Sequence, residues 1–164
     1  MKLSYTVALV LFVASPALAA DNPSQTFLKK AIEGNYAEIQ MGKLAQQNGK
    51  SDGVKQFGQM LSDDHAAANQ KAMDAAKSMG VPPPDGPNAK EKADYDKMAK
   101  LTGERFDRDF AKYMVTDHEK DLADYKKEAK QADAAGDYAK GEIDVLQKHF
   151  DTAKSLHSIK SSSR

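Results

Sequence analysis

Residues 48–79, NGKSDGVKQFGQMLSDDHAAANQKAMDAAKSM, contain the signals that decide the fold. Asn48-Gly49 tolerates the left-handed backbone of a helix C-terminus, and Ser51 can cap a new helix directly afterwards. The inward-facing positions then recur at intervals of three and four residues, the period of an α-helix. They are Val54, Phe57, Leu61, His65, Ala68, Ala72 and Met79. Because the turn is short, we expect antiparallel helices on its two sides.

The same helical period appears in three other long segments, and no segment alternates like a strand. The first segment opens with Asn22 as a plausible N-cap and Pro23 at the first helical position, where a missing N–H costs nothing. The third and fourth segments are separated by a tight turn at 133–136. The sequence therefore predicts long helices over residues 24–47, 51–79, 104–131 and 137–158.

A Pro-rich connection separates the two pairs of long helices. Residues 80–88 contain three consecutive prolines, which remove backbone donors and exclude a helix there. A short helix is predicted at 89–101. Two antiparallel helix hairpins joined by one long crossover define the ferritin-like variant of the four-helix bundle. We expect an all-α domain of this kind over residues 21–160, followed by a flexible tail at 161–164.

A short internal repeat links two of the predicted helices. Phe57 precedes Asp64-His65 by the same interval at which Phe110 precedes Asp117-His118. A duplicated hairpin explains the match, and so does chance similarity between two bundle helices. Both explanations stay open from the sequence.

Residues 1–20 have the features of a cleavable signal peptide. Lys2 gives a positive start, 7–14 is an apolar run too short to span a bilayer, and 17–19 is a small-x-small cleavage site. We expect the mature chain to start near Ala20 or Asp21 and to be periplasmic or secreted. It then has no transmembrane anchor.

The composition restricts the chemistry. The chain has no Cys, which excludes disulfides, thiolate ligands and Cys nucleophiles. Its 24 basic and 24 acidic residues are interspersed, which argues against nucleic acid as a partner. Nucleophile-elbow, phosphate-loop and His-Glu-x-x-His motifs are missing, so we do not expect an ordinary hydrolase.

Three histidines at core positions are the most informative feature. His65, His118 and His149 lie in the apolar stripes of three different helices, and Glu38 lies in the stripe of the fourth. A buried polar group without a partner costs about 1–3 kcal/mol, so we expect these groups to meet. Counting the helical rise from each turn places His118 and His149 within roughly 2 Å of one level. Glu38 and His65 differ by roughly 6 Å.

Three imidazoles and one carboxylate suit a borderline divalent metal such as zinc, iron, copper or manganese. Asp64 and Asp117 directly precede two of the histidines, and adjacent helical residues point about 100° apart, so neither can easily share an ion with its neighbour. We expect both aspartates to orient the imidazoles. The alternative is a hydrogen-bonded His and Glu network without metal.

The spacing of His118 and Asp121 resembles a chelating pair, although an acidic face exposed to solvent is the simpler explanation. His157, near the end of the last helix, is expected at the surface.

The chain resembles the domain of unknown function 4142 family, exported bacterial ferritin-like proteins. The matching motifs are Gly34-Asn35-x-x-Glu38-Ile39, Lys43-Leu44-Ala45, Val54-Lys55-x-Phe57, Asp64-His65, Gly80-Val81-x-x-Pro84, Gly103-x-x-Phe106-Asp107, Asp117-His118 and His149. The resemblance implies the ferritin-like fold, export, and a metal-related or stress-related role. The Glu-x-x-His pairs of di-iron ferritins have no counterpart at His65 or His118, which argues against a di-iron centre.

Two hypotheses follow. The first is a periplasmic metal-binding bundle with Glu38, His65, His118 and His149 as ligands, acting in storage or stress. The second is a non-catalytic module of the cell envelope, in which the same residues form a buried network that fixes helix register. Its partner is then an envelope protein or a second copy of the chain.

Overall fold

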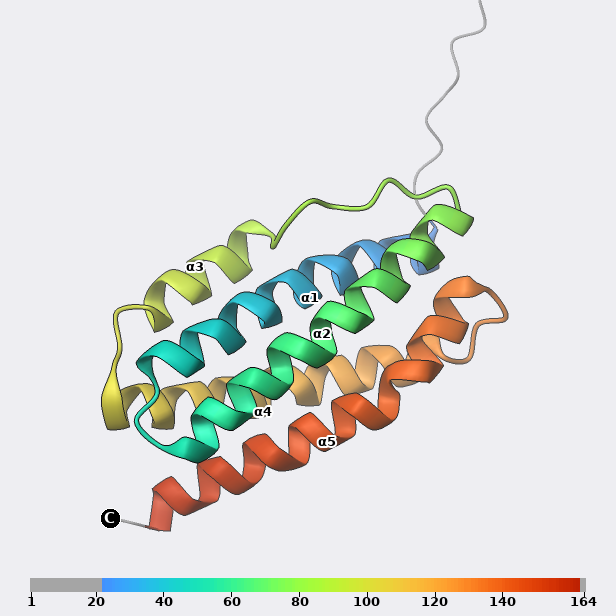
Figure 1. The fold of residues 1–164 in the computed structure, drawn as a ribbon. Coiled ribbons are helices and arrows are strands. Elements are labelled where there is room, and N and C mark those ends of the chain that lie inside the picture. The colour runs from blue at the N-terminus through green and yellow to red at the C-terminus, as the bar shows by residue number, and fades with distance from the viewer. Residues whose placement is uncertain (1–21, 163–164) are drawn as a thin grey trace, which may run out of the picture.

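The computed structural model describes residues 22–162 and forms an all-α helical bundle, as predicted (Figure 1). No β-strand occurs in this range. The helices are α1 (Pro23–Asn48), α2 (Asp52–Ser78), α3 (Ala89–Met98), α4 (Gly103–Glu128) and α5 (Ala134–Ser162). No helix formed by the described residues is long and apolar enough to cross a membrane. The expected signal peptide, 1–20, lies outside the described residues.

The last helix differs most from its predicted bounds. The carboxylate of Asp133 accepts a hydrogen bond of 2.9 Å from the backbone N–H of Gly136, so it caps α5 and starts the helix earlier than expected. At its other end α5 continues to Ser162. Half of the expected tail at 161–164 is therefore helical, and the other half lies outside the described residues.

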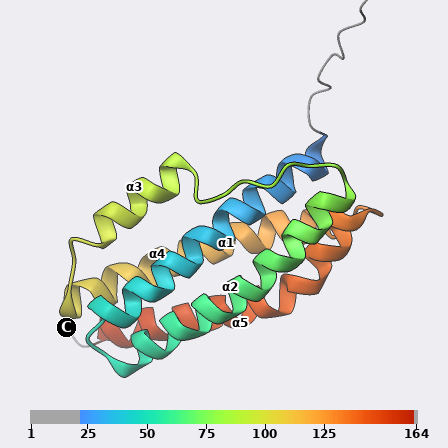
Figure 2. The ribbon, with the colours of Figure 1, turned by 45° about the horizontal axis from the view of Figure 1, so that its top comes forward.

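Two antiparallel hairpins, α1–α2 and α4–α5, pack side by side (Figures 1 and 2). The connection after α2 runs back over the bundle to α3, which packs on α1 and α4. As a result, α4 starts beside the turn between α1 and α2, where Gly49 and Gly103 form an isolated β-bridge. This is the connectivity expected of a ferritin-like bundle.

The α1–α2 turn is fastened to α4 by a buried aspartate. The carboxylate of Asp107, with no exposed surface, accepts hydrogen bonds from the backbone N–H groups of Lys50 at 2.8 Å and Ser51 at 3.0 Å. Asn48 donates from Nδ2 to the carbonyl of Leu101 at 2.9 Å. These contacts join the two hairpins at one end of the bundle.

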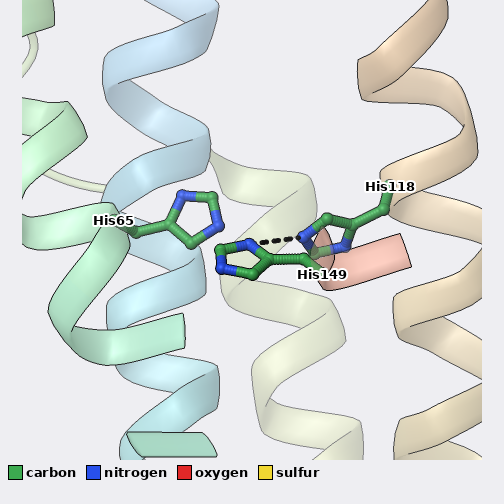
Figure 3. A group of neighbouring side chains, drawn as sticks. All are labelled: His65, His118 and His149. Atoms are coloured by element: carbon green, nitrogen blue, oxygen red, sulfur yellow. Dashed lines mark hydrogen bonds between the residues drawn. The ribbon is translucent and has the colours of Figure 1, made fainter. Parts of the chain in front are cut away.

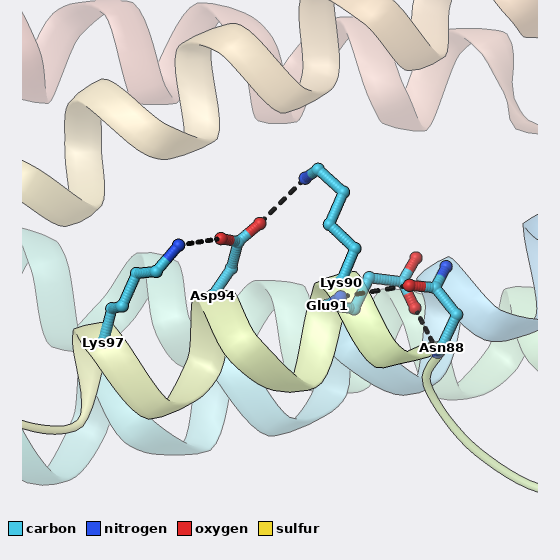
Figure 4. Close-up of polar contacts among 5 residues, drawn as sticks. All are labelled: Asn88, Lys90, Glu91, Asp94 and Lys97. Atoms are coloured by element: carbon cyan, nitrogen blue, oxygen red, sulfur yellow. Dashed lines mark hydrogen bonds and ion pairs between the residues drawn. The ribbon is translucent and has the colours of Figure 1, made fainter.

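A capping box starts α3 (Figure 4). The backbone N–H of Glu91 donates to Oδ1 of Asn88, and the backbone N–H of Asn88 donates to Oε2 of Glu91. This reciprocal pair satisfies two donors that a helix start otherwise leaves open. The helix therefore begins directly after the Pro-rich connection.

The core consists of two apolar clusters separated by a polar layer. One cluster lies near the α4–α5 turn and includes Leu28, Ile32, Ala72, Leu122, Tyr125, Tyr138 and Leu146. The other lies near the α1–α2 turn and includes Leu44, Val54, Phe57, Leu61, Phe106, Phe110 and Met114. Between them along the helices come the buried polar residues Asn35, Glu38, His65, His118 and His149, which we call the polar layer.

Helices α1 and α2 approach each other closely at two glycines. A Cβ atom at Gly58 would lie 2.5 Å from the carbonyl oxygen of Gly42, and one at Gly42 would lie 2.5 Å from that of Gly58. Only glycine fits these positions without moving a helix backbone.

We predict that Gly58→Ala lowers the free energy of unfolding by about 1–3 kcal/mol, because the added methyl group overpacks the crossing. Gly141→Ala is the matched control, since Gly141 lies within α5 and has open space at its Cβ position. The control variant should gain about 0.5–1 kcal/mol from helix propensity. Urea denaturation measures both, and equal effects of the two substitutions would refute the close packing.

Candidate metal centre

Helices α2, α4 and α5 bring His65, His118 and His149 together, as the sequence predicts (Figure 3). One ring nitrogen of each histidine lies within 4.8 Å of those of the other two. The side chains are buried, with 6%, 0% and 0% of their surface exposed. His118 and His149 are in direct contact, which confirms that they occupy one level of the bundle.

The ring of His65 is oriented by an amide on α1. Its Nδ1 lies 2.9 Å from Oδ1 of Asn35. Nδ2 of Asn35 donates to the hydroxyl of Tyr138 at 3.1 Å, which fixes the amide with its oxygen toward the ring. The hydroxyl of Tyr138 also bonds that of Tyr125 at 3.1 Å. Since an amide oxygen only accepts, Nδ1 of His65 carries the proton and Nε2 a lone pair.

The same reasoning assigns the protons of the other two rings. Nδ1 of His118 lies 3.1 Å from the carbonyl of Met114, and Nε2 of His149 lies 2.9 Å from Oδ2 of Asp64. Both partners only accept, so these nitrogens donate. In the neutral rings the remaining atoms, Nε2 of His118 and Nδ1 of His149, carry lone pairs. These two atoms lie 3.3 Å apart.

The bundle interior disfavours a further proton at this contact. Burial lowers the pKa of His118 to about 3, and the neighbouring His149 acts in the same direction. Burial also lowers the pKa of His65, followed by the effects of His118 and His149. The pKa of His149 is lowered by burial as well, although Asp64 opposes the shift. At neutral pH the cluster therefore presents uncharged imidazoles with lone pairs that lack donors.

A metal ion can satisfy such a set of lone pairs. Two nitrogens bound to one tetrahedral zinc ion are separated by about 3.3 Å, given Zn–N bonds of about 2.0–2.1 Å. The His118–His149 contact has this separation. Nε2 of His65 is buried without a hydrogen-bond partner. Each ring also donates its other N–H to an oxygen, the arrangement that orients metal-binding histidines in known sites.

Asp64 and Asp117 were both predicted to orient histidines, and Asp64 does contact one. That histidine lies on a different helix from Asp64. Asp64 holds His149 of α5 and not its neighbour His65. Asp117 instead acts on the carboxyl group of Glu38, and Glu38 is outside the histidine group. Burial and then the charge of Asp117 raise the pKa of Glu38.

Asn35 is the residue that sequence reasoning missed. It lies 14 positions before Gly49 and His65 lies 16 after it, so the helical rise places the two within roughly 3 Å of one level. The same count puts Glu38 farther away. Asn35 was overlooked because an amide is not a usual ligand of these metals.

The internal repeat brings equivalent residues together in the core. The rings of Phe57 and Phe110 lie 6.0 Å apart, and those of His65 and His118 lie 5.9 Å apart. The repeated stretches belong to α2 and α4, the second helix of one hairpin and the first helix of the other. The match therefore does not relate one hairpin to the other, and it gives no support to hairpin duplication.

The fold and the site define a four-helix-bundle protein with a buried three-histidine cluster. The model of the DUF4142 family, described as a domain of unknown function, matches residues 12–156. The chain belongs to this family, which confirms the resemblance seen in the sequence. Comparison with curated proteins and with solved structures finds no match.

We predict that, in the metal-free protein at pH 6, His65 and His118 are neutral with the proton on Nδ1, and His149 is neutral with the proton on Nε2. Nitrogen-15 NMR of the imidazole rings distinguishes these forms. An unfolded His has a pKa of about 6.5, so each depressed pKa makes the unfolded state bind more protons as pH falls. Below pH 6.5, each such ring then lowers the free energy of unfolding by up to about 1.4 kcal/mol for every unit by which the pH falls.

Glu38 and Asp121 act in the opposite direction, because their pKa values are raised in the fold. For this reason the ring spectra, and not total stability, are the decisive measurement. Charged cluster histidines at pH 6 would contradict the assignment.

Proposed function

We propose that this protein is exported to the periplasm and binds one divalent transition-metal ion through His65, His118 and His149, in metal storage or a stress-related role. The supporting observation is the convergence of three buried imidazole lone pairs that have no donor. Imidazole ligands suit zinc, copper and iron. Three protein ligands leave a tetrahedral metal with one position for water or a small ligand.

Export is supported by the sequence. Residues 1–20 have the positive start, short apolar run and cleavage site of a signal peptide. A chain without cysteine needs no disulfide chemistry in that compartment, and nitrogen ligands bind metal there without the risk of thiol oxidation.

The competing function is a metal-free structural module of the cell envelope. The chain of hydrogen bonds from Tyr125 through Tyr138 and Asn35 to His65 favours it, because this chain already links four helices. Two features argue against it. Without a metal, Nε2 of His65 has no partner. At neutral pH, Nε2 of His118 and Nδ1 of His149 also face each other with no proton between them.

We predict that the untagged protein, purified from the periplasmic fraction, contains close to one equivalent of metal by elemental analysis. The His65→Ala, His149→Ala double variant should contain none, with its helicity checked by circular dichroism. Metal added to the stripped wild type should raise the melting temperature. At a metal concentration one hundred times Kd, the free energy of unfolding should increase by about 2.7 kcal/mol. A wild type without metal, and without a thermal shift with zinc, iron, copper or manganese, would support the structural module.

A second prediction concerns the residue behind His149. Asp64→Asn keeps the shape of the side chain but removes the charge that orients the ring, and should weaken metal binding by about 10–100-fold. The neighbouring Asp63→Asn is the control, since Asp63 is exposed and its carboxylate accepts from the amide of Gln59. Calorimetric titration compares the two variants. Equal affinities would remove Asp64 from the site.

A further inference from the structure

A pocket of about 350 Å³ lies between α1, α3 and α4, beside the polar layer. Part of its wall consists of exposed side chains, which include Lys30, Lys90 and Lys120. Another part consists of buried residues, which include Asn35 and His65. The pocket therefore connects the protein surface with the polar layer.

His65 belongs both to the pocket wall and to the histidine cluster. The centre of its ring lies 5.2 Å from that of His149 and 5.9 Å from that of His118. Those two rings have no surface exposed to solvent, and His65 is the cluster residue that lines the pocket. Its Nδ1 atom is held by Asn35, whereas its Nε2 atom has no hydrogen-bond partner. An ion that crosses the pocket therefore meets the imidazole of His65 first.

We propose that this pocket is the passage by which a hydrated divalent ion moves between solvent and the histidine cluster, with His65 as the first ligand that the ion meets. The passage rests on the metal site proposed above, and it adds the route by which that site is loaded and emptied. A metal site needs a path of entry. Three rings with at most 6% of their surface exposed exchange an ion with solvent only through such a path.

The charges of the wall favour a cation over an anion as the species that passes. Three lysines line the pocket, against the five carboxylates of Glu33, Glu91, Asp117, Asp121 and Asp124. Excess charge of one sign in a cleft raises the local concentration of ions of the other sign. The wall therefore attracts metal cations, and the binding itself takes place at the imidazoles.

Gly34 is a wall position that leaves the passage open. It lies on α1 directly before Asn35, and it lines the pocket. A Cβ atom at this position would have Oε1 of Glu91 as its nearest contact, at 4.0 Å. Glu91 lies on α3 and also lines the pocket, so a larger side chain at position 34 would project into the pocket space. Such a substitution obstructs the passage without changing a histidine.

Gly34→Phe tests the passage through the rates of metal exchange. Uptake of Co²⁺ by the stripped protein is followed by stopped-flow absorption, and release of Co²⁺ is followed after addition of EDTA. Both rates should fall by at least about tenfold, which corresponds to a barrier about 1.4 kcal/mol higher. The dissociation constant should stay unchanged, because an obstructed route slows entry and release equally and leaves the bound and free states as they were.

Two control variants separate obstruction from a general effect of substitution. Gly34→Ala adds only a methyl group at the same wall position. Gly141→Phe makes the larger substitution at an exposed glycine of α5 that has open space at its Cβ position. Both controls should exchange Co²⁺ at the rates of the wild type. Circular dichroism and thermal melts verify that all three variants are folded.

A second measurement needs no metal. Diethyl pyrocarbonate acylates neutral imidazoles, and mass spectrometry locates the label in the stripped protein. Gly34→Phe should lower the labelling rate of His65 severalfold, because the reagent reaches this ring through the pocket. The partly exposed His157, near the end of α5, is the internal reference and should be labelled equally in all variants.

Unchanged exchange rates in Gly34→Phe would overturn the passage and leave the metal site in place. Equal slowing in Gly34→Phe and Gly141→Phe would also overturn it. A wild type that binds no metal would instead refute the metal site itself, and the labelling of His65 then decides whether the pocket leads to the cluster. Failure of the passage is thereby distinguishable from failure of the proposed function.

Discussion

Burial of three imidazole rings at one level of the bundle is the constraint on which the rest of the structure depends. Each ring needs an acceptor for its N–H, and the acceptors come from α1, α2 and α4. The rings themselves come from α2, α4 and α5. Helices α1, α2 and α5 are thereby held in register at the polar layer, because a shift of one of them by a turn would separate His65 from Asn35 or His149 from Asp64. The acceptor of His118 lies on its own helix, α4.

The apolar core is arranged around this layer. Leu28, Ile32 and Leu122 pack on one side of it, and Phe57, Phe106 and Phe110 on the other. The hydrophobic effect favours burial of apolar surface but does not by itself specify which groups pair. The close approach at Gly42 and Gly58 and the hydrogen bonds of Asp107 add the directional contacts that apolar packing lacks. Stability and register therefore come from different parts of the molecule.

The polar layer divides into nitrogen and oxygen donors. His65, His118 and His149 present uncharged lone pairs in the core, whereas Glu38 and Asp117 form a carboxyl pair outside this group. The sequence predicted a single site made of Glu38 and the three histidines. In the structure the three histidines group without Glu38. The histidines and the Glu38–Asp117 pair form two separate groups because Glu38 lies about one helical turn from the level of His65.

The sequence by itself determined the helices, the crossover and the meeting of three histidines, because period, caps and prolines are local signals and the rise per residue is constant. It also identified the family through motifs that lie along the whole chain. Tertiary structure alone decided the partner of each polar group: Asp64 holds His149 and not its neighbour His65, Asp117 faces Glu38, and Asn35 holds His65. Those pairings depend on how far each helix is rotated about its axis, which is set by side-chain packing between helices and not by any spacing within one of them.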